Sequence, residues 1–226
     1  MPVRRRIVSS FVCNVPAAGK RAMIALIDYD MGNLGSVAKA LTGLGAKFQM
    51  AADGGGLSEA ACAILPGVGN FGDGMENLRA RGFDTALREF LDRGGWLFGI
   101  CLGMQMMLEA SDEAPGEAGL GFFPGRVRKF DASRGKVPQI GWNSVRFVPG
   151  HPLAAGLPEQ SWFYFVHSYF VEAGHPAAIG TTEYLEPFSS AIGQERCFAT
   201  QFHPEKSQRS GMLLLKNFLG LAGELK

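Results

Sequence analysis

The sequence predicts an α/β fold with an open, mostly parallel sheet and helices on both faces, and three observations support this prediction. Short apolar runs alternate with amphipathic helical patterns from residue 23 to residue 110, which is typical of parallel strands joined by covering helices. From Gly119 onward, strand-like segments follow one another with short turns, so the C-terminal half should be richer in strands. The chain has 226 residues, 46% of them hydrophobic, which is enough for one domain with a sizeable core.

The order of elements predicts a flavodoxin-like arrangement in one domain over residues 23–226. Buried strands are expected at 23–28, 47–51, 61–65 and 94–100. The helical spacing of apolar residues predicts helices at 34–44, 83–91 and 102–110. Further strands are expected at 121–130, 144–148, 163–173, 177–184 and 197–205, with a last helix through Met212, Leu213, Leu215 and Phe218.

The first 22 residues differ from the rest in charge. They carry five basic residues and no acidic one, which leaves 17 basic and 21 acidic residues, a net charge of −4, in the remainder. We interpret them as a disordered basic tail or as the result of a start site assigned too far upstream. A secretory leader is the alternative, but Ser9, Ser10 and Asn14 break its apolar stretch.

The overall charge and hydropathy exclude two kinds of partner. The formal net charge of +1 gives no bulk attraction to nucleic acid or to an anionic membrane. No apolar run approaches the roughly 18 to 20 residues that a membrane-spanning helix needs.

The four cysteines predict free thiols. They stand at positions 13, 62, 101 and 197 and form no C-x-x-C pair, and a chain of this length does not need disulfides in order to fold. A reducing compartment, the cytoplasm, is therefore expected. Cys62 and Cys197 lie in apolar strands and are interpreted as core residues. The spacings of His and Cys fit no ligand set, so neither a metal nor another cofactor is expected.

The stretch "GICLG" at 99–103 predicts a nucleophile. An apolar strand leads into it and a helical pattern follows it, and such a sharp strand-to-helix turn projects its central side chain above the sheet. Gly99 and Gly103 are small, as the residues two before and two after that side chain must be. The start of a helix also favours a thiolate. The alternative is that Cys101 is a buried structural cysteine between two turn glycines.

A nucleophilic cysteine needs a base, and His203 is the best of four candidates. His151 and His175 each precede a proline in turn-like stretches, which suits surface roles. His203 ends an apolar strand, and Glu205 follows two residues later, on the same side of an extended chain. Glu205 would then fix the imidazole tautomer and leave the other nitrogen for Cys101. The alternative is a strand-end histidine beside an unrelated surface glutamate.

The glycine-rich stretch "PGVGNFGDGM" at 66–75 predicts an oxyanion-binding loop. It follows the strand at 61–65 at the sheet edge where the Cys101 turn emerges, and its glycines let backbone N–H groups point into a site. The N–H of Leu102 would be the second donor. A phosphate cradle is the rival interpretation. No G-x-x-x-x-G-K-[ST] is present, and we expect no G-x-G-x-x-G that opens a helix with its acidic partner in place.

Together, these residues resemble the class I, triad-type glutamine amidotransferases. "GICLGMQ" and "QFHPE" are motifs of that class, in the order Cys101, His203, Glu205. Within the class, the chain is similar to the glutaminase subunits of imidazole glycerol phosphate synthases, which act in histidine biosynthesis. The stretches that carry this narrower resemblance are "LPGVGNFGDGM" (65–75), "PQIGWNSV" (138–145), "DYDMGNLGSV" (28–37) and "YFVHSYF" (164–170). The resemblance covers residues 23 to about 222.

The resemblance implies roles for individual residues. Cys101 would attack the side-chain amide of glutamine and form a glutamyl thioester, His203 would protonate the leaving ammonia and then activate water, and Glu205 would orient His203. The N–H groups of Leu102 and Val68 would bind the oxyanion. The residues implied in binding glutamine are Gly69, Gln105, His167, Ser168 and Tyr169, and those implied in docking a partner are Asn33, Gly141, Trp142 and Asn143.

The resemblance also implies a partner. Ammonia would pass into a separate (β/α)8-barrel cyclase subunit of a heterodimer and join a phosphoribulosyl intermediate, giving imidazole glycerol phosphate and aminoimidazole carboxamide ribotide. This sequence has Gln139 where the family usually has a histidine, at a position interpreted as part of the partner face. Because glycine-flanked peptides flip at modest cost, we predict that the Val68 N–H points away from the site until the cyclase binds its ligand.

Three alternative functions remain open at this stage. The chain could be the glutaminase of another synthase, such as those for anthranilate or GMP, although the glycine loop and "GWN" argue against this. It could be a γ-glutamyl hydrolase or peptidase that acts alone. It could also be a catalytically inactive regulatory module, although Cys101, His203 and Glu205 are all present. The sequence does not decide whether Trp142 belongs to the core or to an interface.

Overall fold

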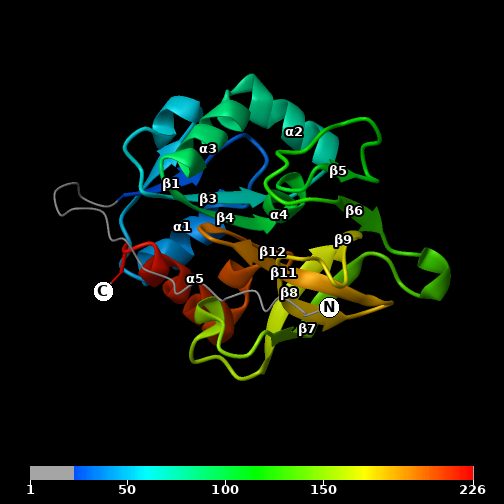
Figure 1. The fold of residues 1–226 in the computed structure, drawn as a ribbon. Helices are drawn as coiled ribbons and strands as arrows, with labels where there is room; N and C mark the ends of the chain where they lie inside the picture. The colour runs from blue at the N-terminus through cyan, green and yellow to red at the C-terminus, as the bar shows by residue number, and fades with distance from the viewer. Residues whose placement is uncertain (1–22, 226) are drawn as a thin grey trace, which may run out of the picture.

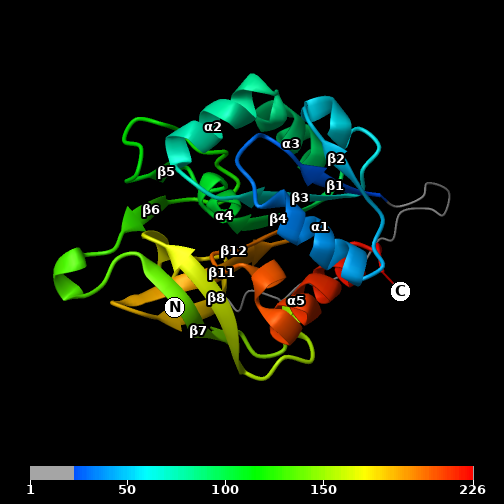
Figure 2. The ribbon, with the colours of Figure 1, turned by 180° about the vertical axis from the view of Figure 1, so that it is seen from behind.

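The computed structural model describes residues 23–225, and the predicted basic tail at 1–22 lies outside the described residues. Within the described part, one twelve-stranded sheet has the main strand order β2-β1-β3-β4-β12-β11-β10-β7-β8 (Figure 1). Helices lie on both faces of this sheet (Figures 1 and 2). The predicted α/β class is therefore confirmed.

One half of the sheet is parallel, and its strands inside the edge strand β2 are buried on both faces. Its strands are β2 (Phe48–Ala51), β1 (Ile24–Ile27), β3 (Cys62–Gly67), β4 (Trp96–Cys101) and β12 (Cys197–Thr200). Every residue of β1 and β3 is buried, because helices cover both faces and leave no polar side to the strands. This explains why the first four of these strands are legible in the sequence as short apolar runs.

The other half of the sheet is antiparallel and contains most of the remaining strands. It continues through β11 (Pro187–Gln194), β10 (Ala178–Glu183), β7 (Gln139–Phe147) and β8 (Gln160–His167), with β5 (Ala110–Ser111), β6 (Arg126–Lys129) and β9 (Tyr169–Glu172) beside them. β11 is not predicted by the sequence, because its centre holds two serines. Both are buried and satisfied within the sheet: the Ser189 hydroxyl donates to Glu172 O at 2.7 Å, and Thr182 donates to the Ser190 hydroxyl at 2.8 Å.

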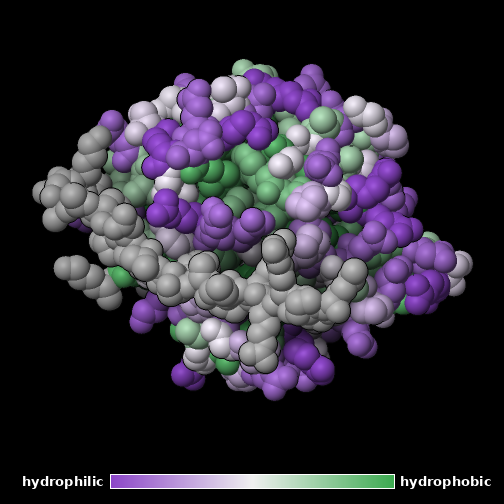
Figure 3. Space-filling view, viewed as in Figure 1, coloured by the Kyte–Doolittle hydropathy of each residue, from purple (hydrophilic) through white to green (hydrophobic). Residues whose placement is uncertain are grey.

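The helices pack in two layers. α1 (Leu34–Gly43) and α5 (Gln208–Leu221) lie on one face, and α2 (Phe71–Ala80) and α3 (Phe83–Asp92) lie on the other (Figures 1 and 2). Each layer has its own apolar core against the sheet. From the side of Figure 1, hydrophilic side chains predominate over the outer helices and apolar residues show between them (Figure 3). No helix in residues 23–225 is both long enough and apolar enough to cross a membrane.

Helix α2 is absent from the sequence prediction, because Gly72 and Gly74 lower the helix propensity of its first turns. Its start is fixed by Asn70, whose side chain accepts hydrogen bonds from the N–H groups of Gly72 and Asp73. Residues 67–72 spell G-x-G-x-x-G between β3 and α2. The next strand ends at Cys101 and not at an acidic residue, so the pattern lacks its acidic partner, as expected from the sequence.

Helix α4 (Leu102–Met106) is shorter than the sequence pattern predicts. The backbone N–H groups of Leu120 and Phe123 donate to the carbonyls of Met106 and Met107 at 2.7 and 3.0 Å. A neighbouring loop thus satisfies the groups that another helical turn would have used, and the helix ends.

Candidate active site

Cys101 lies at the junction of β4 and α4, with φ 54° and ψ −106°. A non-glycine residue rarely adopts a positive φ, and it does so at a cost that the surrounding structure must hold. The side chain is buried, and the next residue begins α4. The predicted strand-to-helix turn at the nucleophile is therefore present.

The glycines around this turn allow the close approach of its two arms. A Cβ added to Gly103 would lie 2.0 Å from Leu65 O, and one added to Gly99 would lie 3.0 Å from the Gly103 carbonyl carbon. Real Cβ atoms do not approach backbone atoms as closely as 2.0 Å, so a larger residue at 103 would push α4 away from β3. At 99, a Cβ would also lie 2.4 Å from Met107 Sδ, so a larger residue there would push α4 away from β4. The small residues that the sequence shows at 99 and 103 are thus required by the geometry.

His203 and Glu205 form a buried pair beside the turn. His203 Nδ1 lies 2.8 Å from Glu205 Oε1, and each side chain is 1% exposed. The sequence predicts this pairing from an extended chain, but the structure makes it in a turn, because a 3-10 helix (Pro204–Lys206) starts directly after His203. The His203 N–H donates to Tyr164 O at 2.9 Å, and the Ser207 hydroxyl donates to His203 O at 2.6 Å.

The electrostatics of His203 favour an imidazolium. Burial opposes the charge, but the Cys101 thiolate, and after it Glu205, raise the pKa of His203 to about 10. Glu205 takes Nδ1, and His203 Nε2 is buried with no hydrogen-bond partner among the described residues. Nε2 is therefore the nitrogen left to serve Cys101, and a thiolate beside an imidazolium is the ionised pair that nucleophilic cysteines use.

Two buried glutamines contact the nucleophile region, and only one of them is expected from the sequence. Gln201 Nε2 lies 3.7 Å from Cys101 Sγ, and its Oε1 accepts from Gln105 Nε2 at 3.1 Å. Gln105 Nε2 also donates to Tyr169 O at 3.2 Å. Gln201 is the first residue of the "QFHPE" motif, but the spacing of that motif points to His203 and Glu205 and gives Gln201 no role.

The predicted oxyanion loop has its donor engaged elsewhere. The Val68 N–H donates to Met31 O at 3.0 Å, and Gly69 has φ 111°, a conformation that glycine adopts without strain. Leu102 is the first residue of α4, a position where backbone N–H groups have no partner within the helix. The two predicted donors therefore differ: the Leu102 N–H is at a helix start, and the Val68 N–H is held by another carbonyl.

The end of β8 approaches Cys101 through Val166, directly before His167, Ser168 and Tyr169, three of the residues expected to bind glutamine. The carbonyl of Val166 lies 3.9 Å from Cys101 Sγ. Ser168 O accepts from the Phe130 N–H at 3.0 Å, and Tyr169 O accepts from both Gln105 and His167 Nδ1, the latter at 2.7 Å. This segment thus presents backbone groups to the nucleophile, fixed on its outer side by hydrogen bonds.

Gln139 supports this segment from inside the protein. It is buried, and its side-chain amide lies 3.0 Å from His167 Nε2. Because His167 uses its Nδ1 proton for Tyr169 O, Nε2 of the neutral ring accepts from the NH₂ group of this amide. Burial, together with the charge of His203, lowers the pKa of His167 to about 4, so His167 is neutral. The interpretation of position 139 as part of the partner face is therefore wrong for its side chain, because alternation along β7 turns it inward.

The residues expected at the partner face do not all share one face. Trp142 is 44% exposed on the outer side of β7, whereas its neighbours Gly141 and Asn143 point to the other side by strand alternation. The Asn143 side chain donates to Glu183 O at 2.8 Å. Asn33 precedes α1, and its side chain accepts from the Ser36 hydroxyl at 3.0 Å. Trp142 is thus a surface residue and not a core residue.

Tyr29 is a second buried residue near the nucleophile that the sequence does not single out. Its side chain is fully buried, and its hydroxyl has no hydrogen-bond partner among the described residues. A Cβ on Gly67 would lie 2.3 Å from this hydroxyl, which places it against the glycine before Val68. Burial, and then the charge of Cys101, raises the pKa of Tyr29, so the phenol is neutral.

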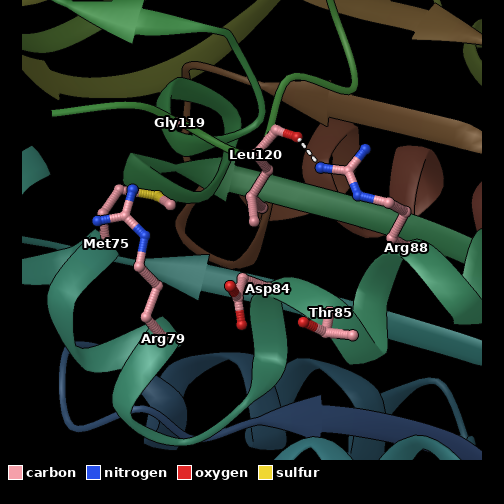
Figure 4. A pocket seen from close by; sticks show the side chains of 7 residues that line it. All are labelled: Met75, Arg79, Asp84, Thr85, Arg88, Gly119 and Leu120. Atoms are coloured by element: carbon pink, nitrogen blue, oxygen red, sulfur yellow. Dashed lines mark hydrogen bonds between the residues drawn. The ribbon is translucent and has the colours of Figure 1, made fainter.

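A separate pocket of about 220 Å³ lies over α2 and α3 and contains none of the predicted site residues (Figure 4). Its two arginines have partners: Arg79 pairs with Glu117 at 2.8 Å, and Arg88 donates to Leu120 O at 2.8 Å. In residues 23–225, no group of three or more His, Cys, Asp and Glu side chains could hold a metal ion.

A comparison of the sequence with models of protein families agrees with the function that this geometry indicates. The model of the family "Glutamine amidotransferase class-I" matches residues 25–221. The chain belongs to this family. The predicted resemblance is thereby confirmed.

Curated relatives within the family are similar over nearly their whole length. The chain is 44% identical over 198 residues to "Imidazole glycerol phosphate synthase subunit HisH" of Chlorobaculum tepidum, covering 87% of this chain and 98% of that protein. It is 47% identical over 196 residues to the subunit of the same name from Moorella thermoacetica, covering 86% and 93%. A subunit HisH 1 from Pseudomonas aeruginosa is 44% identical over 208 residues, covering 88% and 97%.

Solved structures of amidotransferases share the fold at low sequence identity. A structure described as a glutamine amidotransferase superimposes with a TM-score of 0.70 at 19% identity, covering 88% of this chain and 98% of that one. A chain from the structure of PurLQS from Thermotoga maritima gives 0.69 at 15% identity, covering 88% and 98%.

Proposed function

We propose that this chain is the glutaminase subunit of an imidazole glycerol phosphate synthase in histidine biosynthesis. The observation that carries the proposal is the buried arrangement of Cys101, His203 and Glu205 at the end of the parallel strands. The identity of 44–47% to subunits named HisH supports the choice of synthase. The chain would act in the cytoplasm, without a cofactor of its own.

The reaction would begin with attack of the Cys101 thiolate on the side-chain amide carbon of glutamine. The electron pair of the C=O bond moves to oxygen, and the N–H groups of Leu102 and Val68 would stabilise this oxyanion. The imidazolium of His203 gives its Nε2 proton to the amide nitrogen, the C–N bond breaks, and ammonia leaves behind a glutamyl thioester. Neutral His203 then takes a proton from water, the resulting hydroxide attacks the thioester, and glutamate is released with the thiolate restored.

The hydrogen bond from Val68 to Met31 O supports a resting state for this reaction. With that N–H committed at 3.0 Å, Leu102 alone would face the oxyanion. Removing one oxyanion donor costs about 10²- to 10³-fold in rate in enzymes of this kind. We therefore expect low activity in the isolated chain and activation when a partner reorients the Gly67–Val68 peptide.

The outer face of the β7–β8 hairpin would receive the (β/α)8-barrel cyclase subunit. Trp142 and Tyr164 are directly opposite each other, and their rings contact edge to face with centroids 6.3 Å apart. Ile140 is 57% exposed on the same side of β7. The paired residue of Ile140 is Val166, whose carbonyl lies beside Cys101. A partner docked on this apolar face would therefore touch the segment that surrounds the nucleophile.

The proposal is tested by measuring glutamate release from glutamine with and without the cyclase subunit loaded with its phosphoribulosyl substrate. We expect stimulation of about 10²- to 10³-fold, the effect on the rate of gaining one oxyanion donor. Cys101→Ala should abolish turnover, with a loss of at least about 10³-fold, and the cyclase should still use added ammonia in its presence.

Other outcomes select the other functions. Stimulation by an anthranilate or GMP synthase partner, and not by the cyclase, would identify the chain as the glutaminase of that synthase. Rapid turnover without any partner would identify a γ-glutamyl hydrolase. No turnover under any condition would identify an inactive module.

A further inference from the structure

Gln201 occupies a position from which it can act on the nucleophile. It follows β12 and is fully buried, and its backbone N–H donates to Ser190 O at 2.9 Å. Its side-chain amide spans the space between Cys101 and Gln105, with contacts of 3.7 Å to sulfur and 3.1 Å to nitrogen. Its backbone is thus held by the sheet while its side chain faces the reacting sulfur.

The hydrogen bonds around Gln201 allow one orientation of each amide. The carbonyl of Tyr169 can only accept, so the Gln105 atom 3.2 Å from it must be the NH₂ group. That same NH₂ donates to Gln201, so the Gln201 atom it meets must be the oxygen. The NH₂ group of Gln201 is then the group that faces Cys101 Sγ. The Tyr169 carbonyl thus fixes the orientation of Gln105, which in turn fixes the orientation of Gln201. As a result, Gln201 presents a hydrogen-bond donor to the sulfur.

A donor aimed at sulfur favours the thiolate over the thiol. A thiolate accepts hydrogen bonds strongly, and a bond to the charged form stabilises that form. Val166 O, at 3.9 Å from the sulfur, is an acceptor that suits the S–H of the thiol. The amide of Gln201 therefore acts with His203, whose charge also favours the thiolate, and against Val166 O.

We propose that Gln201 is a positioning residue that holds the Cys101 thiolate and couples it to Gln105, the residue expected to bind glutamine. The coupling to Gln105 rests on the proposed function, whereas the effect on the thiolate does not. Engagement of glutamine by Gln105 would tighten the amide that donates to the attacking sulfur. Substrate binding and nucleophile orientation would then share one hydrogen-bond network.

The test is the rate of alkylation of Cys101 by iodoacetamide as a function of pH, followed by mass spectrometry of the Cys101 peptide in the full-length protein. Gln201→Glu keeps the size of the side chain and its acceptor for Gln105, but it places a carboxylate on the sulfur. We expect the pH midpoint of alkylation to rise by about one unit or more and the rate at pH 7 to fall about tenfold. Gln201→Met removes the donor without adding charge and should shift the midpoint in the same direction by less.

Thr200→Val is the matched control. The Thr200 hydroxyl donates to Phe202 O at 3.0 Å and is buried one residue before Gln201, so its loss lowers stability without removing a donor to sulfur. The other titratable groups that act on the site, His203, Glu205, Tyr29 and His167, are the same in all variants. We expect the control to keep the wild-type midpoint.

Kinetics with glutamine separate the two parts of the proposal. In the activated complex, Gln201→Glu should lower kcat with little change in KM, whereas Gln201→Met should also raise KM because Gln105 loses its acceptor. An unchanged alkylation midpoint in both folded variants would overturn the role of Gln201. The alkylation profile needs neither glutamine nor a partner, so it tests the role of Gln201 independently of the proposed function. An unchanged midpoint would overturn that role even if the cyclase stimulates wild-type turnover. A raised midpoint would support it even if such turnover is absent.

Discussion

The parallel and antiparallel halves of the sheet differ in how their faces are covered. Helices cover both faces of the parallel half, and β1 and β3 are buried along their whole length. In the antiparallel half, the hairpin of β7 and β8 buries one face and leaves the other open, with Ile140, Trp142 and Trp162 exposed at 57%, 44% and 57%. One half is complete within the chain, and the other retains an apolar face that a partner could cover.

The proposed active site lies where these two halves meet. The parallel half supplies the strained Cys101 turn, β12 leads to His203, and the end of β8 supplies the backbone groups around the sulfur. The difference between the halves therefore separates two demands: rigid support for the nucleophile, and an open surface through which its activity can be controlled.

Substitutions on the two faces of the β7–β8 hairpin should give the largest changes in stability and in cyclase binding. Phe163 is fully buried and stacks on Phe202 with ring centroids 4.1 Å apart. Phe163→Ala should lower the free energy of unfolding by about 3–5 kcal/mol, measured by urea denaturation. Trp142→Ala, on the open face, should change it by about 1 kcal/mol or less and instead weaken cyclase binding by about 2 kcal/mol or more, measured by calorimetric titration.

Met50→Ala is the control for the open face, because Met50 is 46% exposed on β2, at the opposite end of the sheet. It should leave cyclase binding unchanged. Equal binding by wild type and Trp142→Ala would show that the hairpin face is not the docking surface.

The next effect concerns the rigid half. Gly103→Ala places a Cβ 2.0 Å from Leu65 O and should cost about 3 kcal/mol of stability, near the upper end of overpacking effects. Gly35→Ala is the matched change in α1, where a Cβ meets nothing within 4 Å, and it should stabilise the helix by about 0.5–1 kcal/mol. In thermal unfolding, the midpoint should fall for Gly103→Ala and rise for Gly35→Ala. A rise for Gly103→Ala would contradict the close approach of α4 to β3.

The pH dependence of the free energy of unfolding should reveal the ion pair of Cys101 and His203, which lies at the junction between the halves. The pKa of His203 is raised from its usual 6.5 to about 10, so its contribution is complete below about pH 6.5 and is lost as the pH rises toward 10. The unfolded Cys101 thiol keeps a proton up to about pH 8.5 that the folded thiolate lacks, so the two differences in bound protons cancel below that pH. We expect stability to fall by up to about 1.4 kcal/mol per pH unit above it, or about 1 kcal/mol between about pH 8.5 and pH 10. In Cys101→Ala the charge that raises this pKa is gone, so an equal fall in that variant would exclude the ion pair as its source.

The smallest effect should come from Tyr29. Its hydroxyl is buried without a partner in the described chain, so Tyr29→Phe should raise the free energy of unfolding by about 1 kcal/mol. Tyr184 donates to Lys136 O at 2.8 Å, and Tyr184→Phe should give no gain. A loss of stability in Tyr29→Phe would mean that its hydroxyl is satisfied in solution.

The sequence predicts the parallel half better than the rest, for a physical reason. Strands buried on both faces are apolar throughout, and their run length and spacing are visible in one dimension. β11 is not predicted as a strand, because the polar side chains of Ser189 and Ser190 are satisfied by hydrogen bonds to groups that the local sequence does not reveal. α2 escapes because Asn70 starts a helix that glycines would otherwise disfavour.

The site follows the same rule. The Cys101 turn and the pairing of His203 with Glu205 depend on residues close in sequence, so spacing reveals them. Gln201 and Tyr29 approach Cys101 and Gly67 only through the folded sheet, and nothing in their own neighbourhoods announces it. The opposite orientations of Trp142 and Asn143 were within reach of strand alternation, but that argument needs the strand bounds that the structure supplies.

The peptide bond between Cys101 and Leu102 also crosses the sheet. Cys101 belongs to the apolar cluster on the side of α1 and α5, and Leu102 belongs to the cluster on the side of α2 and α3. The attacking sulfur and the N–H expected to receive the oxyanion are thus anchored in different helical layers. Their relative placement therefore depends on how the two helical layers pack against the sheet, and not on the turn alone.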